Sequence, residues 1–483
     1  MTRSLLKRLI VPVAAALLGG SPSLVRADDP SPRKPDYRRY TVAMHVHSLI
    51  SPNGRVMLNA IAAQAKKDRI DVLIPTDHFL MRWEYGLSFL PGILKATVYR
   101  SCVLKFGPAH YLNLIRKIQK DVPEVLIIPG LEVAPTYDWL GHPFEGNLTL
   151  FGSQRHLLVL GLQKAEDYLR LPVRSNPHAG EFRWRHLVLP VLLVLAGLAL
   201  MIRWPAGLLV VVAGSLLILN ERPFRRLPEY FYNWENNGYR AAQHLIDTVD
   251  KQGGLTVWCH PEAPNWSEAV RLYRNIFTKT DPYPDCVLQT SDHTGFSYFW
   301  EGAKTIGITG GLWDRALLEH CAGRRDRPVW AFGELDWIEE KHLDVTLDSL
   351  VNVAWCTEKS TGAVMDALRS GRFYVYLSDK KTALTLARWE LSAGRQTALS
   401  GETLDWTPDA RLTIRIDSPR AGTPVHGEII KNGVSWKTFD GELPLSVVLP
   451  LKDQPDAKDY YRFVVNGAGT LVGNPIFIRK NPQ

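Results

Sequence analysis

Short apolar runs that end in turn-forming or polar residues alternate with segments of helical periodicity along most of the chain. Such runs are typical of buried parallel strands, and they cover residues 40–44, 72–75, 125–129, 157–160, 255–259, 286–289 and 329–332. Between them, apolar residues recur at three- and four-residue spacing, which predicts packed amphipathic helices in segments 56–67, 111–120 and 239–251. The alternation predicts an α/β fold, either a β/α barrel or a wound sheet.

The pattern changes from about Lys380, where short alternating runs are separated by Gly, Asn, Asp and Pro. Alternation with a period of two is typical of half-buried strands. We therefore expect residues 380–483 to form a small all-β domain of the sandwich type.

The first 27 residues combine Arg3, Lys7 and Arg8 with an apolar stretch and a small-residue exit that ends at Ala27. This pattern is typical of a secretory signal peptide. The apolar stretch is short for a spanning helix, which needs roughly 20 residues, so cleavage before Asp28 is favoured over an uncleaved anchor. The mature chain is expected to start outside the cytoplasm.

Residues 187–219 form a second apolar region, interrupted by Arg203, Trp204 and Pro205. One helix of this length would span about 50 Å, more than the hydrocarbon layer, and would place Arg203 near its middle. Two legs, residues 187–202 and 206–219, instead predict a transmembrane hairpin with its turn at the far headgroup surface. A buried helical pair in a soluble core is the alternative.

The orientation of this hairpin receives conflicting signals. Five arginines flank it, namely Arg183, Arg185, Arg222, Arg225 and Arg226, and positive flanks favour the cytoplasmic side. The signal peptide predicts export. Because charge bias only tilts topology, we expect an exported, membrane-associated protein, with the cytoplasmic face of the membrane as the alternative.

Composition excludes several classes of protein. With 46% hydrophobic and 22% charged residues, the chain is neither disordered nor of low complexity. The formal charge is +8, but four of the positive charges lie in the first 27 residues, so no nucleic-acid partner is expected. The five cysteines are scattered without a CxxC pair, so neither a disulfide framework nor a thiolate zinc site is indicated.

Histidines and carboxylates stand at the ends of most predicted strands. The first strand ends in His45-Val46-His47, and residues two apart on a strand point to one side, so both imidazoles can reach one metal ion. Other strand ends carry Asp77, His78, Glu132, His156, His260 and Asp336. Because α/β folds build their sites at the carboxyl ends of strands, this series predicts a metal cluster.

The ordered motifs HVHS, PTDH, PGLEV, HLLVLG, CHPE and GELD resemble those of the polymerase and histidinol phosphatase (PHP) superfamily, over roughly residues 37–377. Segments 358–375 and 474–476 resemble its carbaryl-hydrolase-like branch, the CehA/McbA family. The resemblance implies a distorted seven-stranded β/α barrel in two parts, residues 37–183 and 227–378, with the hairpin inserted between them.

The resemblance also implies two ligand sets for divalent ions, which would be zinc, manganese or iron. In the first, His45, His47, Glu132 and Asp336 bind one ion. In the second, Glu132, His156 and His260 bind another, with Glu132 bridging the two.

The chain departs from the superfamily pattern at Asn53 and Ile338, where histidines are often found. An isoleucine cannot coordinate a metal, and an Asn carbonyl is a poor ligand for a transition metal. A third metal site at His78 is therefore expected to be incomplete. His78 is then expected to position a substrate oxyanion or a proton, and Asp77 to orient the metal-bound water or act as its base.

Several other residues compete for these roles. His142 is a rival of His156, although Pro143 interrupts the strand that should follow it, and the pair Asp292-His293 is expected at a rim or in a loop. Glu334 and Glu262 are either supporting carboxylates or solvated, and Cys259 is expected to be a buried strand residue. The aromatic insertion after PTDH, with Trp83, Tyr85, Phe89, Tyr99 and Phe106, would close over the site, rest on a bilayer or simply pack.

Two divalent ions that share a carboxylate would activate a water molecule for hydrolysis. The leading prediction is thus a membrane-tethered metallohydrolase acting on a small-molecule phosphoester. One alternative is the same chemistry on a carboxyl ester, amide or carbamate. The other is a non-catalytic module that binds an envelope component.

Overall fold

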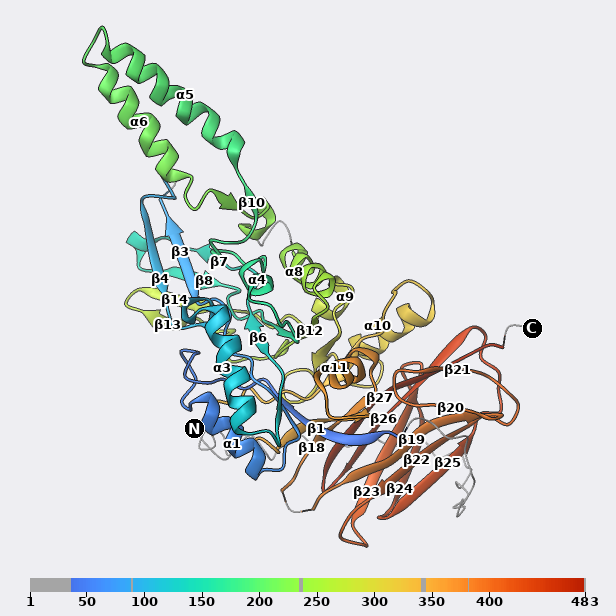
Figure 1. The fold of residues 1–483 in the computed structure, drawn as a ribbon. Helices are drawn as coiled ribbons and strands as arrows, with labels where there is room; N and C mark the ends of the chain where they lie inside the picture. Colours follow the sequence, from blue (N-terminus) through green and yellow to red (C-terminus); the bar gives the residue numbers. More distant parts are fainter. Residues whose placement is uncertain (1–35, 88–89, 234–237, 340–344, 381, 482–483) are drawn as a thin grey trace.

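The computed structural model describes residues 36–87, 90–233, 238–339, 345–380 and 382–481. The predicted signal peptide, residues 1–27, and Phe89 lie outside the described residues. Within them, the chain is a mixed α/β protein with a strand-rich C-terminal region and a protruding pair of helices (Figure 1).

A long mixed sheet extends from the α/β part of the molecule into the strand-rich region. Its strands are, in spatial order, β5 (Leu126–Ile127), β2 (Val72–Ile74), β1 (Arg38–Met44), β17 (Leu350–Cys356), β18 (Phe373–Leu377), β27 (Gly469–Arg479), β26 (Lys458–Gly467), β23 (Pro424–Lys431) and β24 (Val434–Glu442). A short strand, β21 (Thr403–Asp405), also pairs with β27. β1 is parallel to β2 and antiparallel to β17.

A second sheet completes the α/β part. Its strands are, in spatial order, β6 (Gly130–Val133), β9 (Leu157–Leu160), β12 (Leu255–Trp258), β15 (Gly295–Ser297) and β16 (Trp330–Phe332). Two isolated parallel bridges, His78 to Glu132 and Val46 to Trp337, connect its two edges to the ends of β2 and β1. Both connections lie where the candidate site residues are.

Smaller sheets lie beside the second sheet. They are the antiparallel pair β3 (Arg82–Gly86) and β4 (Lys95–Tyr99), the pair β10 (Glu181–Phe182) and β11 (Arg225–Arg226), and the four strands β7 (Asp138–Leu140), β8 (Leu148–Phe151), β14 (Ile276–Lys279) and β13 (Val270–Tyr273). The aromatic insertion after PTDH thus forms β3, β4 and the short helix α2 (Val103–Phe106).

Helices pack on the sheets through the apolar faces that the sequence predicts. They are α1 (Leu58–Lys67), α3 (Pro108–Asp121), α4 (Ala165–Leu169), α8 (Arg240–Lys251), α9 (Cys286–Gln289), α10 (Leu312–Cys321) and α11 (Thr361–Ser370), with 3-10 turns η2 (Pro143–Glu145) and η3 (Glu229–Phe231). In α8 the buried residues are Ala241, Ala242, Leu245, Ile246 and Val249, which is one stripe at three- and four-residue spacing. The three predicted helices, within segments 56–67, 111–120 and 239–251, are all present.

Two of the strand expectations are wrong. Residues 286–289 form helix α9, and the strand in that part of the chain is β15, because a four-residue apolar run does not distinguish a strand from a buried helical turn. The run 157–160 is a strand, but it is antiparallel to both neighbours, β6 and β12, rather than parallel.

The strand-rich region consists of two facing sheets. One is the β27, β26, β23 and β24 end of the long sheet, and the other contains β20 (Gln396–Ala398), β19 (Thr385–Ala393), β22 (Arg411–Asp417) and β25 (Leu445–Pro450). Trp389 of β19 packs against Phe463 of β26, with ring centroids 4.7 Å apart. Because β27 also pairs with β18, the region after residue 380 shares a continuous sheet with the α/β part.

The protruding helices are α5 (Trp184–Met201) and α6 (Gly207–Asn220), which lie side by side in Figure 1. The break at Arg203-Trp204-Pro205 falls between them, as the two-leg pattern predicts. Of the described helices, only α5, with 18 residues and a mean hydropathy of 1.9, is long and apolar enough to cross a membrane. Leu189 and Leu209 are 64% and 72% exposed, so the pair is not a buried core element.

Small residues bring α5 and α6 close together. Pro190, Gly197, Gly207 and Gly214 are the buried residues of the pair. A Cβ on Gly214 would lie 2.8 Å from the carbonyl oxygen of Pro190, and one on Gly197 would lie 2.7 Å from the backbone nitrogen of Val211. Close packing of small residues is how helices associate where lipid surrounds them.

Candidate metal centre

Six histidine and acidic side chains converge on Glu132 from the ends of five other strands. His45 and His47 follow β1, His78 follows β2, His260 follows β12 and Asp336 follows β16. His156 instead precedes β9. Because β9 is antiparallel to its neighbours, its first end lies where the other strands finish, which places His156 in the same group.

The Glu132 carboxylate lies at the centre of this group. Its Oε1 is 2.6 Å from Nδ1 of His156, 3.1 Å from Nε2 of His260 and 3.4 Å from Nε2 of His45. Its Oε2 is 2.9 Å from Nδ1 of His78 and 3.3 Å from Nε2 of His47. The two oxygens thus face different sets of imidazoles, an arrangement suited to a bridging carboxylate.

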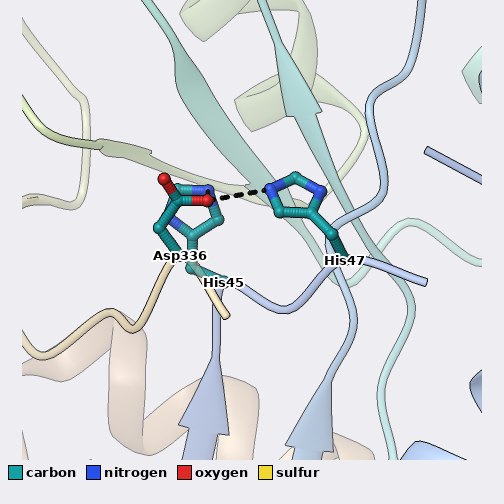
Figure 2. A group of neighbouring side chains, drawn as sticks. All are labelled: His45, His47 and Asp336. Atoms are coloured by element: carbon teal, nitrogen blue, oxygen red, sulfur yellow. Dashed lines mark ion pairs between the residues drawn. The ribbon is translucent and has the colours of Figure 1, made fainter. Parts of the chain in front are cut away.

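Asp336 closes the group on the His45 and His47 side. Its Oδ1 is 3.2 Å from Nε2 of His47, the ion pair drawn in Figure 2, and 3.7 Å from Nε2 of His45. The Asp336 side chain is 52% exposed, whereas those of His45 and His47 are fully buried. Asp336 therefore marks a side on which the cluster meets solvent.

The Nδ1 atoms of His45 and His47, which point away from Glu132, contact side chains outside the cluster. Nδ1 of His45 contacts Oε2 of Glu334, whose Oε1 accepts a hydrogen bond of 2.8 Å from Ser297. Nδ1 of His47 lies 3.2 Å from Oγ of Ser51. Partners of this kind set the tautomer and orientation of a metal-binding imidazole, and they leave both Nε2 atoms directed at the carboxylates.

Tyr283 has the same relation to His260. Its hydroxyl lies 3.2 Å from Nδ1 of His260 and donates to the backbone carbonyl of Cys259 at 2.6 Å. Neither Tyr283 nor Ser51 or Ser297 was indicated by the sequence, because none of them stands in a motif or at a strand end that the pattern marks. The sequence indicates that Glu334 is either a supporting carboxylate or a solvated one, and the structure places it in contact with His45.

Asp77 does not join the cluster through its side chain. Its carboxylate accepts hydrogen bonds from the backbone nitrogen of Ser48 at 2.8 Å, from Oγ of Ser48 at 2.7 Å and from Oγ of Ser51 at 2.7 Å. These hydrogen bonds stabilise the turn that follows His47. The expected action of Asp77 on a metal-bound water stays a prediction, and its contacts favour a positioning role.

Three residues of the cluster have left-handed backbone conformations. The φ angles are 61° at His45, 39° at His260 and 44° at Asp336. Such angles are uncommon outside glycine and cost about 1 to 3 kcal/mol each, so they persist where the surrounding structure requires them. Here they turn the chain within four residues of the end of a strand and direct the side chain towards the cluster.

The cluster contains buried polar atoms that have no hydrogen-bond partner among the described residues. They are Nε2 of His45, Nε2 of His47 and Oε2 of Glu132. Unpaired buried polar atoms are rare, and an ion that binds them is one explanation. The described residues supply four donor sets with atoms within 4.8 Å of one another: His45, His47 and Asp336; His45, Glu132 and Cys259; His47, His78 and Glu132; and Glu132, His156 and His260. Imidazole and carboxylate donors fit zinc, manganese or iron.

Three imidazoles bind protons tightly in the metal-free protein. Burial lowers the pKa of His47, but the nearby carboxylates of Asp336 and Glu132 raise it more, to about 9. Burial likewise lowers and Glu132 raises the pKa of His260, with a net value of about 9. The pKa of His45 is also raised overall, since Glu334, Glu132 and Asp336 outweigh its burial.

The remaining ligands shift in the direction that suits metal binding. Burial lowers the pKa of His156 to about 4 in spite of Glu132, so this imidazole is neutral at pH 7. Burial raises the pKa of Glu132, but His156, His78 and His45 hold it well below its ordinary value. His45 and His47 keep the pKa of the half-exposed Asp336 carboxyl below the usual range.

The structure separates the rival residues from the cluster. His142 lies in an exposed turn, where its Nδ1 accepts a hydrogen bond from the backbone of Phe144. His293 is buried elsewhere, 3.2 Å from Oγ1 of Thr290. Cys259 adjoins the cluster, 3.9 Å from Oε1 of Glu132, and burial raises the pKa of its thiol.

Glu262 has a structural role. Its buried carboxylate accepts hydrogen bonds from the backbone nitrogens of Lys304, Thr305 and Ile306, at 2.6 to 3.0 Å. Glu262 therefore stabilises the loop that follows β15 and does not support an imidazole of the cluster.

Comparison with known proteins finds remote structural relatives. No protein-family model and no curated protein matches the chain. A two-domain protein from Bacteroides vulgatus, described as containing a predicted PHP-like metal-dependent phosphoesterase, is 11% identical with a TM-score of 0.37, over 95% of this chain and 99% of that one. A candidate metal-dependent phosphoesterase from Bifidobacterium adolescentis is 12% identical with a TM-score of 0.28, over 62% of this chain and 89% of that one.

The first of these structures is named for the superfamily that the ordered motifs resemble. Neither name refers to the carbaryl-hydrolase-like branch. Both likenesses are remote, so the function of this protein has to be inferred from the side chains of the cluster.

Proposed function

We propose that this protein is a metal-dependent hydrolase of the PHP type that cleaves a small-molecule phosphoester. The observation that supports this most is the convergence of five imidazoles on the two oxygens of Glu132, with Asp336 beside two of these imidazoles. Two bridges link the sheets at this point into a ring of the seven strands β1, β2, β6, β9, β12, β15 and β16, which supports the distorted barrel of that superfamily.

The proposed ligand sets follow the distances. His45, His47 and Asp336 hold one divalent ion, and Glu132, His156 and His260 hold a second, with Glu132 shared between them. When bound, such ions supply activation of water and charge neutralisation at a phosphoryl group. His78, which also contacts Glu132, is the residue that decides whether a third ion can bind.

The chain's own residues orient this chemistry. With Nδ1 of His78 held at 2.9 Å from Glu132, Nε2 is the ring nitrogen that can donate to a phosphoryl or leaving-group oxygen when the imidazole is protonated on both nitrogens. Glu334 and Asp77 have positioning roles. Glu334 orients His45, and Asp77 stabilises the turn after His47. The exposed side of Asp336 is the proposed entrance for substrate.

Metal analysis combined with one substitution tests the ligand sets. We expect His260→Ala to lose bound metal relative to the wild type when both are measured by inductively coupled plasma mass spectrometry. His426→Ala is the matched control, because His426 is exposed in the strand-rich region and pairs only with the exposed Asp440. Unchanged metal content in His260→Ala would exclude this assignment.

A substrate panel tests the reaction class. The metal-loaded protein is expected to hydrolyse p-nitrophenyl phosphate or bis-p-nitrophenyl phosphate with manganese or zinc. Turnover of p-nitrophenyl carboxyl esters alone would identify the same centre as an esterase or amidase. A loaded centre without any turnover would identify a binding module.

We further propose that α5 and α6 insert into a bilayer from the exported side. The exposed leucines of both helices support insertion, as do Arg203 and Trp204 at the turn. The exported side rests on the signal-peptide pattern alone, because the arginines that flank the hairpin favour the cytoplasmic side. A reporter fused to the C-terminus tests the side: an alkaline phosphatase fusion is expected to be active, whereas an active cytoplasmic reporter would place the hydrolase on the inner face.

A further inference from the structure

A pocket of about 370 Å³ lies at the foot of the helical hairpin. Its walls come from four stretches of the sequence: the β3–β4 insertion, residues 137–139, residues 174–177, and residues 222–232, which follow α6. The insertion is attached to the hairpin directly, since the backbone nitrogen of Gly92 donates to the Asn220 side chain at 2.9 Å. Figure 1 shows the ends of β3 and β4 beside the lower end of α6.

The lining of this pocket is strongly cationic. Six positive side chains line it, with Glu84 as the one lining carboxylate; they are Arg82, Lys95, Arg174, Arg222, Arg225 and Arg226. Glu84 forms ion pairs with two of them, with Arg82 at 2.6 Å and with Lys95 at 2.9 Å. The pocket therefore holds a surplus of positive charge.

Several of these cations lack a carboxylate partner. Within the described part of the chain, no ion pair involves Arg222, Arg225 or Arg226, and Arg225 donates only to the carbonyl oxygen of Gly180. The Nε–H of Arg82 is buried and has no hydrogen-bond acceptor among the described residues. Guanidinium groups without a carboxylate partner around one cavity favour an anionic ligand, and phosphate is an anion that their planar donors match.

Aromatic side chains line the same pocket. The guanidinium carbon of Arg174 lies 4.3 Å from the ring centroid of Tyr137 and 5.2 Å from that of Tyr232. Trp139 is fixed by a hydrogen bond of 2.8 Å from its indole nitrogen to the carbonyl of Glu84. Arginine mixed with Tyr and Trp beside an apolar helix is the composition of a membrane–water interface.

We propose that this pocket binds a phosphate-bearing anion at the membrane surface, supplied by the headgroup of an anionic phospholipid. The inference goes beyond the hydrolase function, since none of the proposed metal ligands lines the pocket. The choice of a lipid headgroup as the source of the anion rests on the proposed insertion of the hairpin, which brings the pocket to the level of the headgroups. The volume is within the range of small-molecule sites, roughly 300–1,000 Å³.

Calorimetric titration of the full chain in a non-ionic detergent tests the proposal. The probes are dihexanoyl phosphatidylglycerol, dihexanoyl phosphatidylcholine and inorganic phosphate. The wild type is compared with the double variant Arg222→Ala/Arg226→Ala and with Arg203→Ala, which removes an exposed arginine at the far turn of the hairpin.

We expect the wild type and Arg203→Ala to bind phosphatidylglycerol alike, and the double variant to bind it at least about tenfold more weakly, as the loss of two surface cations predicts. Phosphatidylcholine should bind more weakly than phosphatidylglycerol to the wild type. Equal affinities of the double variant and the wild type for phosphatidylglycerol would overturn the proposal, as would equal affinities of the wild type for the two lipids.

The phosphate arm distinguishes the two sources. Inorganic phosphate that binds the wild type as tightly as phosphatidylglycerol, and is lost in the double variant, would support the anion site and overturn the lipid source. Bound metal and the thermal midpoint of unfolding serve as checks that the double variant is folded. Lys95→Ala, which alters the opposite wall of the pocket, should weaken phosphatidylglycerol binding in the same direction.

Discussion

The cluster around Glu132 and the pocket at the foot of the hairpin balance their charges in opposite ways. In the metal-free cluster, His45, His47 and His260 bind protons at pH 7, and three carboxylates, those of Glu132, Glu334 and Asp336, face them. The pocket has six cationic side chains and one carboxylate. The charges of the cluster therefore pair with one another, whereas the cations that line the pocket exceed the carboxylates that line it.

This difference indicates what each region binds. A divalent cation enters the cluster by displacing protons from imidazoles that already point at the carboxylates, so the fold does not need to rearrange. An anion enters the pocket by balancing guanidinium groups that the fold leaves unpaired. Burial separates the two further, because buried charges are screened by salt much less than exposed ones.

The largest expected effect is that of Glu132→Gln. Glu132 contacts every imidazole of the cluster, and its loss removes the shared ligand of both proposed ions. We expect bound metal to fall below detection and hydrolysis to fall by at least about 1,000-fold, measured by mass spectrometry and phosphoester assays. Asp440→Asn, which neutralises an exposed carboxylate that pairs with His426, should change neither quantity.

Metal affinity should rise with pH. The pKa values of His47 and His260 are each about 9, so at pH 7 the ion bound through His47 and the ion bound through His260 each have to displace a proton from that imidazole. Each of these displacements should increase the affinity by up to about tenfold per pH unit below pH 9, with proton release on binding. Titration in buffers of different ionisation enthalpy measures both, and pH-independent affinity would contradict the charge balance described above.

The metal-free protein should show the opposite trend. A histidine whose pKa is raised by folding adds stability that is complete below its unfolded pKa, near 6.5, and is lost as the pH rises through the folded value. For His47 and His260 that loss occurs between pH 6.5 and about 9. The metal-free protein should thus unfold at a lower temperature at pH 9.5 than at pH 7, by differential scanning calorimetry.

Removing the support of one imidazole should have a smaller effect. Glu334→Gln removes the charge that holds Nδ1 of His45, and we expect metal affinity to fall by about 10- to 100-fold. Glu262→Gln is the matched control, because Glu262 is also a buried carboxylate but binds only backbone nitrogens. It should lower the unfolding temperature and leave metal affinity unchanged, whereas a similar loss of affinity in both variants would remove the special role of Glu334.

The smallest expected effect is that of ionic strength, which should weaken lipid binding at the pocket more than metal binding at the cluster. Raising the ionic strength from 0.05 to 0.5 M shortens the Debye length from roughly 14 Å to 4 Å, so binding of phosphatidylglycerol at the exposed arginines should weaken by several-fold. Metal retention during dialysis in the same buffers should change by less than about twofold, because the cluster is buried. Equal sensitivity of both would contradict the contrast in burial.

Much of the candidate metal centre could be predicted from the sequence, because most of its proposed ligands stand next to strands that apolar runs reveal. His45 and His47 are read directly from period-two geometry, and Glu132, His260 and Asp336 from their places after other runs. The direction of β9 could not be predicted, since an isolated apolar run has no signal for parallel or antiparallel pairing. His156 reaches the cluster only because that strand is reversed.

Supporting residues were less visible. Asp77 shares a motif with His78, but only the structure turns its carboxylate towards Ser48 and Ser51. Ser297 and Tyr283 carry no sequence signal at all, because a hydroxyl that meets an imidazole from another element leaves no pattern along the chain. The four-residue helix α9 was missed for the related reason that four apolar residues carry too little periodicity.

The sequence by itself determined the chemical inventory and the local periodicity: the imidazoles and carboxylates at strand ends, the amphipathic helices and the apolar hairpin with its charged turn. Only the tertiary structure decided that Glu132 stands at the centre, that Asp77 is turned away, and that six cations from three distant stretches surround one pocket. The physical reason is that periodic burial is a local property of the chain, whereas convergence depends on strand direction and packing between residues up to hundreds of positions apart.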